Sequence, residues 1–226
     1  MASNSPRHQA PGKASPAPPP VTGDAARALL SEATALLEAE RLDEACPLAE
    51  RLVQMRPKDA TFRNLLGVIH RRRGDMTKAI ATFREAVRLD PRLFSAAFNL
   101  ARCQYLAGDF AAAIEGFRKL ARLNPKHAET LRLLGVAQEA SGDRATAAAT
   151  LKRALMVDPR SIEAWQDRVR VVSDLGDAAG ALADVDRALA VAPTHRDLRR
   201  TRGILYRRLA NFSAAQEIYE QLLAED

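Results

Sequence analysis

The sequence predicts an all-α protein built as a solenoid of repeated helix pairs, and three observations carry this prediction. Prolines recur every 34 residues, at Pro57, Pro91, Pro125, Pro159 and Pro193. A Gly-Asp pair recurs with the same period, beginning at Gly74-Asp75. Between these marks the apolar residues follow the three- and four-residue spacing of helix faces. A fixed period of this length is the signature of stacked supersecondary units.

Each period predicts two antiparallel helices, as residues 60–93 illustrate. Gly74 tolerates positive φ and therefore ends the first predicted helix. Asp75 can cap the second helix, which ends at Asp90 because Pro91 disfavours helix at the residue before it. The connection is so short that the two helices must lie against each other. A lone pair cannot bury both of its apolar stripes, so each unit is expected to stack on the next.

Small and bulky residues alternate in fixed columns of the repeat. One small column consists of Ala45, Ala79, Ala113, Ala147, Ala181 and Ala215, and a second of Ala33, Gly67, Ala101, Gly135, Val169 and Gly203. A mostly bulky column consists of Ala49, Phe83, Phe117, Leu151, Val185 and Tyr219. We expect the small residues to lie where the two helices of a unit cross, with Phe83 filling the space beside Gly67.

These columns resemble the tetratricopeptide repeat family. One unit matches its pattern at Leu66-Gly67, Ala79, Phe83, Ala86 and Pro91, and others match at Leu134-Gly135, Trp165, Ala188, Gly203, Tyr206 and Tyr219. The resemblance covers residues 24–226 and divides them into repeats at about 26–59, 60–93, 94–127, 128–161, 162–195 and 196–226. It implies a right-handed superhelix of six antiparallel helix pairs, whose first helices line a concave groove that binds peptides.

The first 23 residues differ in composition from the repeats. Residues 1–23 contain six prolines together with Ala, Ser and Gly, and almost nothing apolar to bury, which predicts a disordered tail. They lack the apolar stretch of a secretory signal, and no apolar run in the chain is long enough to cross a membrane. Cys46 and Cys103 fall in apolar columns, which predicts two core thiols. We therefore expect a cytoplasmic protein without a membrane partner.

The resemblance implies that the groove is lined by residues of the first helices. The candidate binding residues, concentrated in the second and third repeats, are Asn64, Arg71, Arg72, Phe98, Asn99, Arg102, Tyr105 and Arg132. Arginines near aromatic residues favour an acidic or C-terminal peptide, because guanidinium pairs bidentately with carboxylate. A solvated face with aromatics on the groove floor is the alternative. The net charge of +6 fits an acidic partner or a compositional bias toward Arg.

The subtype of the family that clamps a terminal dicarboxylate is a poorer match. That subtype uses Lys and Asn over consecutive repeats. Val68 and Val136 stand where an Asn is wanted, and no Lys lies near them. The sequence therefore does not predict that specialised function.

Two arginines interrupt the apolar pattern of the first helices. Arg168 and Arg202 replace leucines of earlier repeats, and a buried guanidinium needs a partner. Asp184 and Asp186 lie on the following helix at a suitable height. We interpret Arg168 with Asp184 as a structural ion pair in preference to a functional one.

Catalytic, metal and nucleic-acid sites are not indicated. Among the four histidines, His8 lies in the tail, His127 and His195 follow repeat-ending prolines, and His70 replaces a packed Tyr of the family. No Cys/His spacing suits a metal, and no phosphate loop or nucleophile motif is present, which predicts a non-enzyme without cofactor or metal. The basic run from His70 to Arg73 falls at a helix end, where positive charge is favourable. It lacks interleaved aromatics, so no nucleic-acid partner is expected.

The function predicted from these features is a scaffold that binds a protein or peptide segment in the groove. The last predicted helix still carries Ile218, Tyr219, Leu222 and Leu223 without a following polar cap. Either the chain is part of a longer protein, or a second copy covers this helix by self-association. The resemblance further implies that in bacterial proteins a sulfotransferase or glycosyltransferase domain can follow such an array. The alternative function is therefore the recognition arm of a larger bacterial enzyme.

Overall fold

The computed structural model describes residues 23–225, which form twelve α-helices arranged as six consecutive pairs. The pairs are α1 Gly23–Glu38 and α2 Leu42–Met55, α3 Ala60–Arg72 and α4 Met76–Leu89, α5 Phe94–Leu106 and α6 Phe110–Leu123, α7 Ala128–Ala140 and α8 Arg144–Val157, α9 Ile162–Asp174 and α10 Ala178–Val191, and α11 Arg196–Arg208 and α12 Phe212–Leu223. The predicted tail lies outside the described residues, except that α1 already begins at Gly23.

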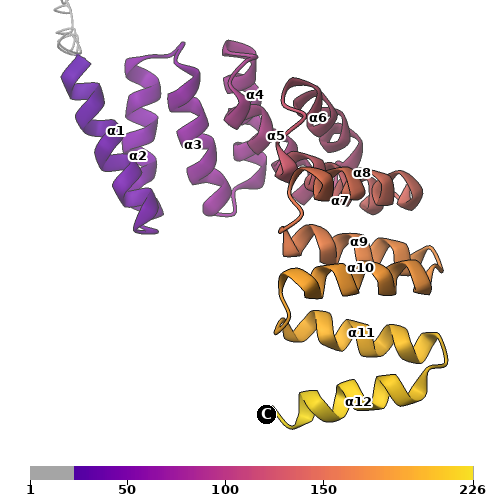
Figure 1. The fold of residues 1–226 in the computed structure, drawn as a ribbon. Coiled ribbons are helices and arrows are strands. Elements are labelled where there is room, and N and C mark those ends of the chain that lie inside the picture. Colours follow the sequence, from indigo (N-terminus) through magenta and orange to yellow (C-terminus); the bar gives the residue numbers. More distant parts are fainter. Residues whose placement is uncertain (1–22, 226) are drawn as a thin grey trace, which may run out of the picture.

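The helices stack in chain order into a right-handed superhelix, as predicted. Figure 1 shows that the helix axes turn progressively, so that α9 to α12 run across the direction of α1 to α4. Odd-numbered helices also contact the next odd-numbered helix, from α1 with α3 to α7 with α9. We call the odd-numbered helices the inner helices and the even-numbered ones the outer helices. The inner helices therefore form the concave side, and α9 and α11 approach each other less closely.

The turn inside each pair uses a left-handed residue. Gly74, Gly108, Gly142 and Gly176 have φ between 82 and 94°, which confirms their predicted role. Glu40 and Ala210 replace glycine at the two ends of the array and adopt φ of 57 and 59°. This conformation costs Glu40 and Ala210 about 1 kcal/mol each, because both carry a side chain. The packing of the two helices against each other therefore imposes the turn even without glycine.

The aspartates after the turn glycines cap the outer helices unequally. The side chains of Asp109, Asp143 and Asp177 accept hydrogen bonds from backbone N–H groups of α6, α8 and α10. Asp75 occupies the same place before α4, but its side chain accepts no such bond. The prediction that Asp75 caps its helix is therefore wrong.

The helices of a pair cross at the predicted small residues. A Cβ added to Gly67 would lie 2.6 Å from a ring carbon of Phe83, and one added to Gly203 would lie 2.9 Å from the Tyr219 ring. In the third repeat Ala101 holds the predicted small position and the glycine is on the other helix, where a Cβ at Gly116 would lie 2.9 Å from Cβ of Ala101. Close packing thus keeps one small residue at each of these crossings and a ring or apolar side chain beside it.

Candidate functional site

Neighbouring inner helices are joined by polar contacts that repeat in two registers. In the first register, a residue contacts the residue 35 positions later: Asn99 donates to Asn64 at 3.2 Å, and Arg132 donates to Asp167 at 2.8 Å. In the second, the step is 31 residues, and it joins Glu139 to Arg170. The concave side therefore consists of equivalent positions that can be compared from repeat to repeat.

Arg71 and Arg102 occupy the same 31-residue register between α3 and α5 as Glu139 and Arg170 do between α7 and α9. Where the later pair has opposite charges, the earlier pair has two positive ones. Burial lowers the pKa of Arg71 most, and the neighbouring positive charge of Arg102 lowers it further. The two guanidinium groups therefore lie close enough to repel each other.

Among the residues that the structure describes, none neutralises the charge of Arg71. Its Nε atom is buried and has no hydrogen-bond partner. Within residues 23–225, neither Arg71 nor the exposed Arg102 forms an ion pair. Asn64 and Asn99 form the adjoining amide pair, and Asn64 also donates to Ser95 at 3.5 Å. This half of the concave side therefore carries two neighbouring cations and one amide pair on the same two inner helices.

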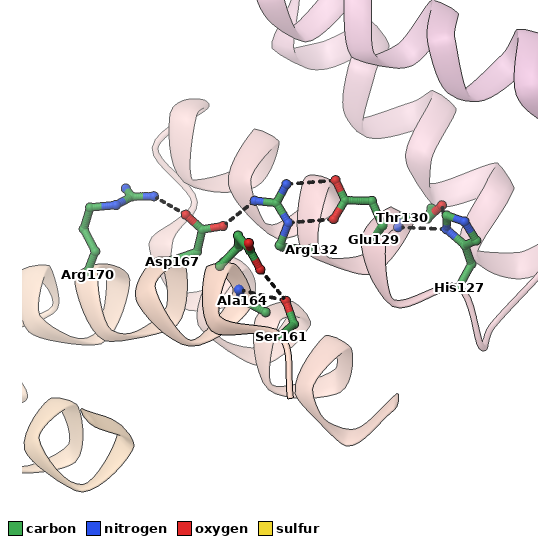
Figure 2. A network of polar contacts seen from close by, with 9 residues as sticks. His127, Glu129, Thr130, Arg132, Ser161, Ala164, Asp167 and Arg170 are labelled. Carbon is green, nitrogen blue, oxygen red and sulfur yellow. Dashed lines mark hydrogen bonds and ion pairs between the residues drawn. The ribbon is translucent and has the colours of Figure 1, made fainter. Parts of the chain in front are cut away.

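The corresponding region between α7 and α9 is neutralised by the chain itself. Arg132 contacts Glu129 at 2.7 and 2.8 Å and Asp167 at 2.8 Å, and Arg170 contacts Asp167 at 3.1 Å. Arg170 also pairs with Glu139. Figure 2 shows Arg170, Asp167, Arg132 and Glu129 as one continuous chain of contacts. The hydrogen bonds that Arg132 donates to Glu129 raise the pKa of Arg132, while burial raises the pKa of Asp167 against the opposing effect of Arg132.

The remaining candidate residues are used partly for packing. Arg72 pairs with Glu40 of the first repeat. Phe98 meets Phe117 edge to face at 5.8 Å between ring centroids, and Tyr105 lies 5.8 Å from Phe110. Both aromatic side chains therefore pack against the outer helix α6. Asn64, Arg71, Asn99 and Arg102 are brought together, whereas Arg132 is held in the separate network of Figure 2.

Sequence reasoning missed Asp167, the residue that joins the two arginines of the network. The sequence does contain a signal for Asp167, because it lies 68 residues, or two repeat lengths, after the candidate residue Asn99. A residue in the same column faces the same groove. Reading each candidate down its column would have found this carboxylate beside Arg132.

The ion pair predicted behind the groove is present. Arg168 Nε lies 2.8 Å from Asp184 Oδ2, and the side chain of Asp184 is only 3% exposed. Arg168 also donates to the carbonyl of Ala148 at 2.7 Å. Arg202 pairs with Asp186 at 2.9 Å in a more exposed position.

A cavity of about 370 Å³ opens between α9 and α11, where the inner helices are less closely packed. Its apolar lining comes from Val169, Leu198, Ile204 and Leu205. Its polar rim includes Gln166, Ser173, Thr201 and Arg208. The groove therefore changes character along its length, from cationic to neutralised to partly apolar.

The histidines of the repeats have structural environments. Nδ1 of His127 accepts from the backbone N–H of Thr130 at 3.1 Å, and Nδ1 of His195 accepts from that of Leu198 at 3.4 Å. Both residues therefore cap inner helices. His70 is buried with its Nδ1 unpartnered, and burial lowers its pKa. None of the helices within residues 23–225 combines the length and apolarity that crossing a membrane requires.

The self-association predicted through the last helix stays a prediction. Leu223 and Phe212 of α12 are 72% and 65% exposed. Tyr219 and Leu222 line a shallow hollow with Arg200 on α11. These residues form an apolar face of the kind that partners cover, although single exposed apolar residues are also ordinary.

The fold defines a helical-repeat solenoid with a concave groove, the class of protein that presents an extended surface to another molecule. Two tetratricopeptide repeat models match residues 30–94 and 104–167, together more than half of the chain. The chain belongs to the tetratricopeptide repeat family. No curated protein sequence matches it.

Solved structures share this fold at low sequence identity. A tetratricopeptide repeat protein from Parabacteroides merdae is 18% identical with a TM-score of 0.75, over 90% of this chain and 81% of that one. MamA from Desulfovibrio magneticus is 17% identical with a TM-score of 0.72, over 77% and 99%. YrrB, described as having an unusual peptide-binding site, is 18% identical with a TM-score of 0.64, over 78% and 91%. The chain therefore shares the fold of these solved structures.

Proposed function

We propose that this protein binds a peptide or an extended protein segment along the concave groove formed by its inner helices. The observation that carries this proposal is the pair of unneutralised arginines, Arg71 and Arg102, beside the amides of Asn64 and Asn99. Amide side chains can hold a main chain, and arginines can hold carboxylates. A segment carrying acidic groups fits this half of the groove.

A binding role is proposed in preference to catalysis. His127 and His195 are used as helix caps, and Arg132, Asp167 and Arg170 hold one another. General acid–base catalysis needs a titratable group poised beside a substrate, and these groups are already committed to structure. We propose the cytoplasm as the compartment, because Cys46 and Cys103 are buried free thiols, as is usual under reducing conditions.

The test is to block the groove at one point without touching the arginines. Val136 on α7 stands in the same column of the repeat as Arg102 and Arg170, and it is half-buried. The Val136→Trp variant would place a bulky ring in the middle of the groove. Ala149→Trp is the matched control, because Ala149 is exposed on the outer helix α8 of the same repeat.

Peptides that bind the wild-type chain would be selected from a random 12-residue display library and measured by fluorescence anisotropy. We expect Val136→Trp to weaken the selected peptides by about tenfold or more, since a blocked groove loses several side-chain contacts. Ala149→Trp should bind them as the wild type does. Equal affinity of Val136→Trp and Ala149→Trp for every selected peptide would remove the groove as the binding surface. Circular dichroism melting would confirm that both variants fold.

A further inference from the structure

The outer helices α6 and α8, with the junctions that follow them, carry an excess of positive charge. Residues 110–126 and 144–160 together contain eight Arg or Lys and two carboxylates, so their net charge equals the +6 of the whole chain. Ala121 of α6 and Ala154 of α8 pack with Leu131 of α7 in one apolar cluster. The C-terminal halves of the two outer helices therefore lie near each other, and their charges act on one surface (Figure 1).

Most of this positive charge is not neutralised by neighbouring carboxylates. Glu115 is already paired with Arg118 and Lys119 at 3.4 and 3.5 Å. Asp158 accepts the backbone N–H of Arg160 at 3.0 Å. The outer cations, as we call the exposed residues that follow in each segment and form no ion pair within residues 23–225, are Arg122, Lys126, Lys152, Arg153 and Arg160.

Exposed apolar side chains lie among the outer cations. Leu123 and Met156 are 72% and 74% exposed, and Val157 is 38% exposed. Residues four apart share one face of a helix, so Met156 lies beside Lys152 and Val157 beside Arg153. Leu123 ends α6 and stands in the same column of the repeat as Val157. Single exposed apolar residues are ordinary, but three of them within a cationic surface form an amphipathic patch.

We propose that the outer side of α6 and α8 is a docking surface for an anionic phospholipid membrane. The outer cations pair with the lipid phosphates and acidic headgroups, which are attracted to clustered Lys and Arg. Leu123 and Met156 enter the boundary between the headgroups and the acyl chains, as the apolar side chains of interfacial helices do. Docking at the surface needs no spanning helix, so it departs from the expectation of no membrane partner, which rested on the length of the apolar runs.

The apolar side chains favour a membrane over other polyanions. Nucleic acid phosphates need only cations, and the stacking of bases needs aromatic side chains. Among the described residues of α6 and α8, no aromatic side chain is exposed. A bilayer offers a use for both halves of the patch, because its headgroups match the outer cations and its acyl boundary matches Leu123 and Met156.

This surface is separate from the groove of the proposed function. The groove is lined by the inner helices, whereas the outer cations belong to α6, α8 and the junctions after them. A membrane bound on the outer side therefore leaves the groove open to a peptide. The inference goes beyond the proposed function, because it adds a second partner on the opposite side of the solenoid.

The experiment measures how much of the full chain sediments with phosphatidylcholine vesicles, with and without a quarter of phosphatidylglycerol. Arg122→Glu/Arg153→Glu reverses one outer cation on each of the two helices. Lys78→Glu/Arg144→Glu is the matched control, because it changes the net charge by the same amount near the N-terminal ends of α4 and α8. Lys78 and Arg144 are also exposed and form no ion pair within residues 23–225.

We expect the wild type to bind the anionic vesicles at least about tenfold more tightly than the neutral ones, since each basic residue near an anionic surface contributes about a fivefold factor. Arg122→Glu/Arg153→Glu should lose most of this preference, and Lys78→Glu/Arg144→Glu should keep it. Circular dichroism melting would check that both variants fold.

The apolar contact is tested by fluorescence. The Leu123→Trp variant should shift its emission to shorter wavelength when anionic vesicles are added, because the indole ring leaves water for the bilayer boundary. Leu175→Trp is the control, since Leu175 is 49% exposed in the turn of the fifth repeat, away from the outer cations. Its emission should not shift.

Three results would overturn the proposal. They are equal binding of the wild type to both kinds of vesicle, an equal loss of binding in the two charge variants, and an unshifted emission of Leu123→Trp. Binding of a labelled hexaglutamate peptide or of duplex DNA in place of the anionic vesicles would assign the surface to an acidic protein or to nucleic acid, and would overturn it as well. Peptides selected from the random library should bind Arg122→Glu/Arg153→Glu as they bind the wild type, so failure here leaves the groove function standing.

Discussion

The second and fourth repeats build the same backbone and use it differently. In the fourth, Glu139 and Arg132 complete a chain of ion pairs with Asp167 and Arg170 of the fifth. In the second, Arg71 faces Arg102 of the third repeat with no carboxylate between them. Since packing constraints are shared, the difference separates polar residues that join neighbouring repeats from arginines whose charge is not neutralised within residues 23–225.

The largest effect is expected where a charge is both buried and paired. Asp184→Ala leaves the guanidinium of Arg168 without its charged partner, and the side chain of Asp184 is 3% exposed. Removing one member of a buried pair costs about 3 kcal/mol, so urea unfolding followed by circular dichroism should show a loss near that size. The Arg168→Leu/Asp184→Leu double variant should recover most of it. A loss of peptide binding in Arg168→Leu at unchanged stability would show that the pair is functional instead.

An intermediate effect is expected within the neutralised network. Asp167→Asn weakens the contacts to both Arg132 and Arg170, whose side chains are 20% and 48% exposed. Because solvent screens the more exposed partner, we expect a loss of about 1 kcal/mol in the free energy of unfolding. Asn99 stands in the same column of the third repeat as Asp167 does in the fifth, so Asn99→Asp is the reverse exchange at an equivalent position. If Asp167→Asn left the urea midpoint unchanged, the network would not be what stabilises the fourth and fifth repeats against each other.

A smaller and opposite pair of effects is expected from exchanging charges between the two regions. Arg71→Glu creates an opposite-charge pair with Arg102 and should stabilise the fold by about 0.5 kcal/mol, because Arg102 is exposed. Glu139→Arg creates a like-charge pair with Arg170 and should destabilise it by a similar amount. Urea midpoints measured at 50 mM and 500 mM salt would check this, since both shifts should shrink as salt screens them. Shifts of the same sign would contradict the equivalence of the two positions.

Much of the fold follows from the period of the sequence. The proline column places the turns between pairs, and the glycine column places the turns within the four middle pairs. The pairing of Gly67 with Phe83 and of Gly203 with Tyr219 places the crossings. These features are local, and a 34-residue repeat multiplies each one. Glu40 and Ala210 show the limit, because their positive φ comes from stacking and not from their own preference.

The candidate site was less predictable, for a physical reason. Helical periodicity identifies the concave residues, so Arg71, Arg102 and Arg132 look alike in sequence. Whether the charge of each arginine is neutralised depends on the residue 31 or 35 positions later, on the next inner helix. For Arg132 that residue is Asp167, whereas for Arg71 it is Arg102. The register between repeats is set by packing, and it becomes visible only when the helices are stacked.

The smallest effect concerns pH and again compares the second and fourth repeats. His70 is buried, and its burial lowers its pKa, while Gln138 occupies the same position in the fourth repeat. The unfolded chain protonates His70 near its ordinary pKa of about 6.5, whereas the folded chain resists protonation. The unfolded state therefore binds more protons as the pH falls below that value, so His70 makes stability decline with falling pH.

The His70→Gln variant should remove this part of the pH dependence. Charges around the imidazole act in both directions, since Lys78 and Arg73 lower its pKa and Asp75 and Glu50 raise it, and the variant leaves all four in place. Urea midpoints at pH 7.5 and 5.5 should then fall less in His70→Gln than in the wild type. Gln138→Ser is the control for the equivalent buried position, and its urea midpoint should change with pH as much as that of the wild type. Identical slopes for the wild type and His70→Gln would mean that the buried imidazole accepts a proton as readily in the folded chain as in the unfolded one.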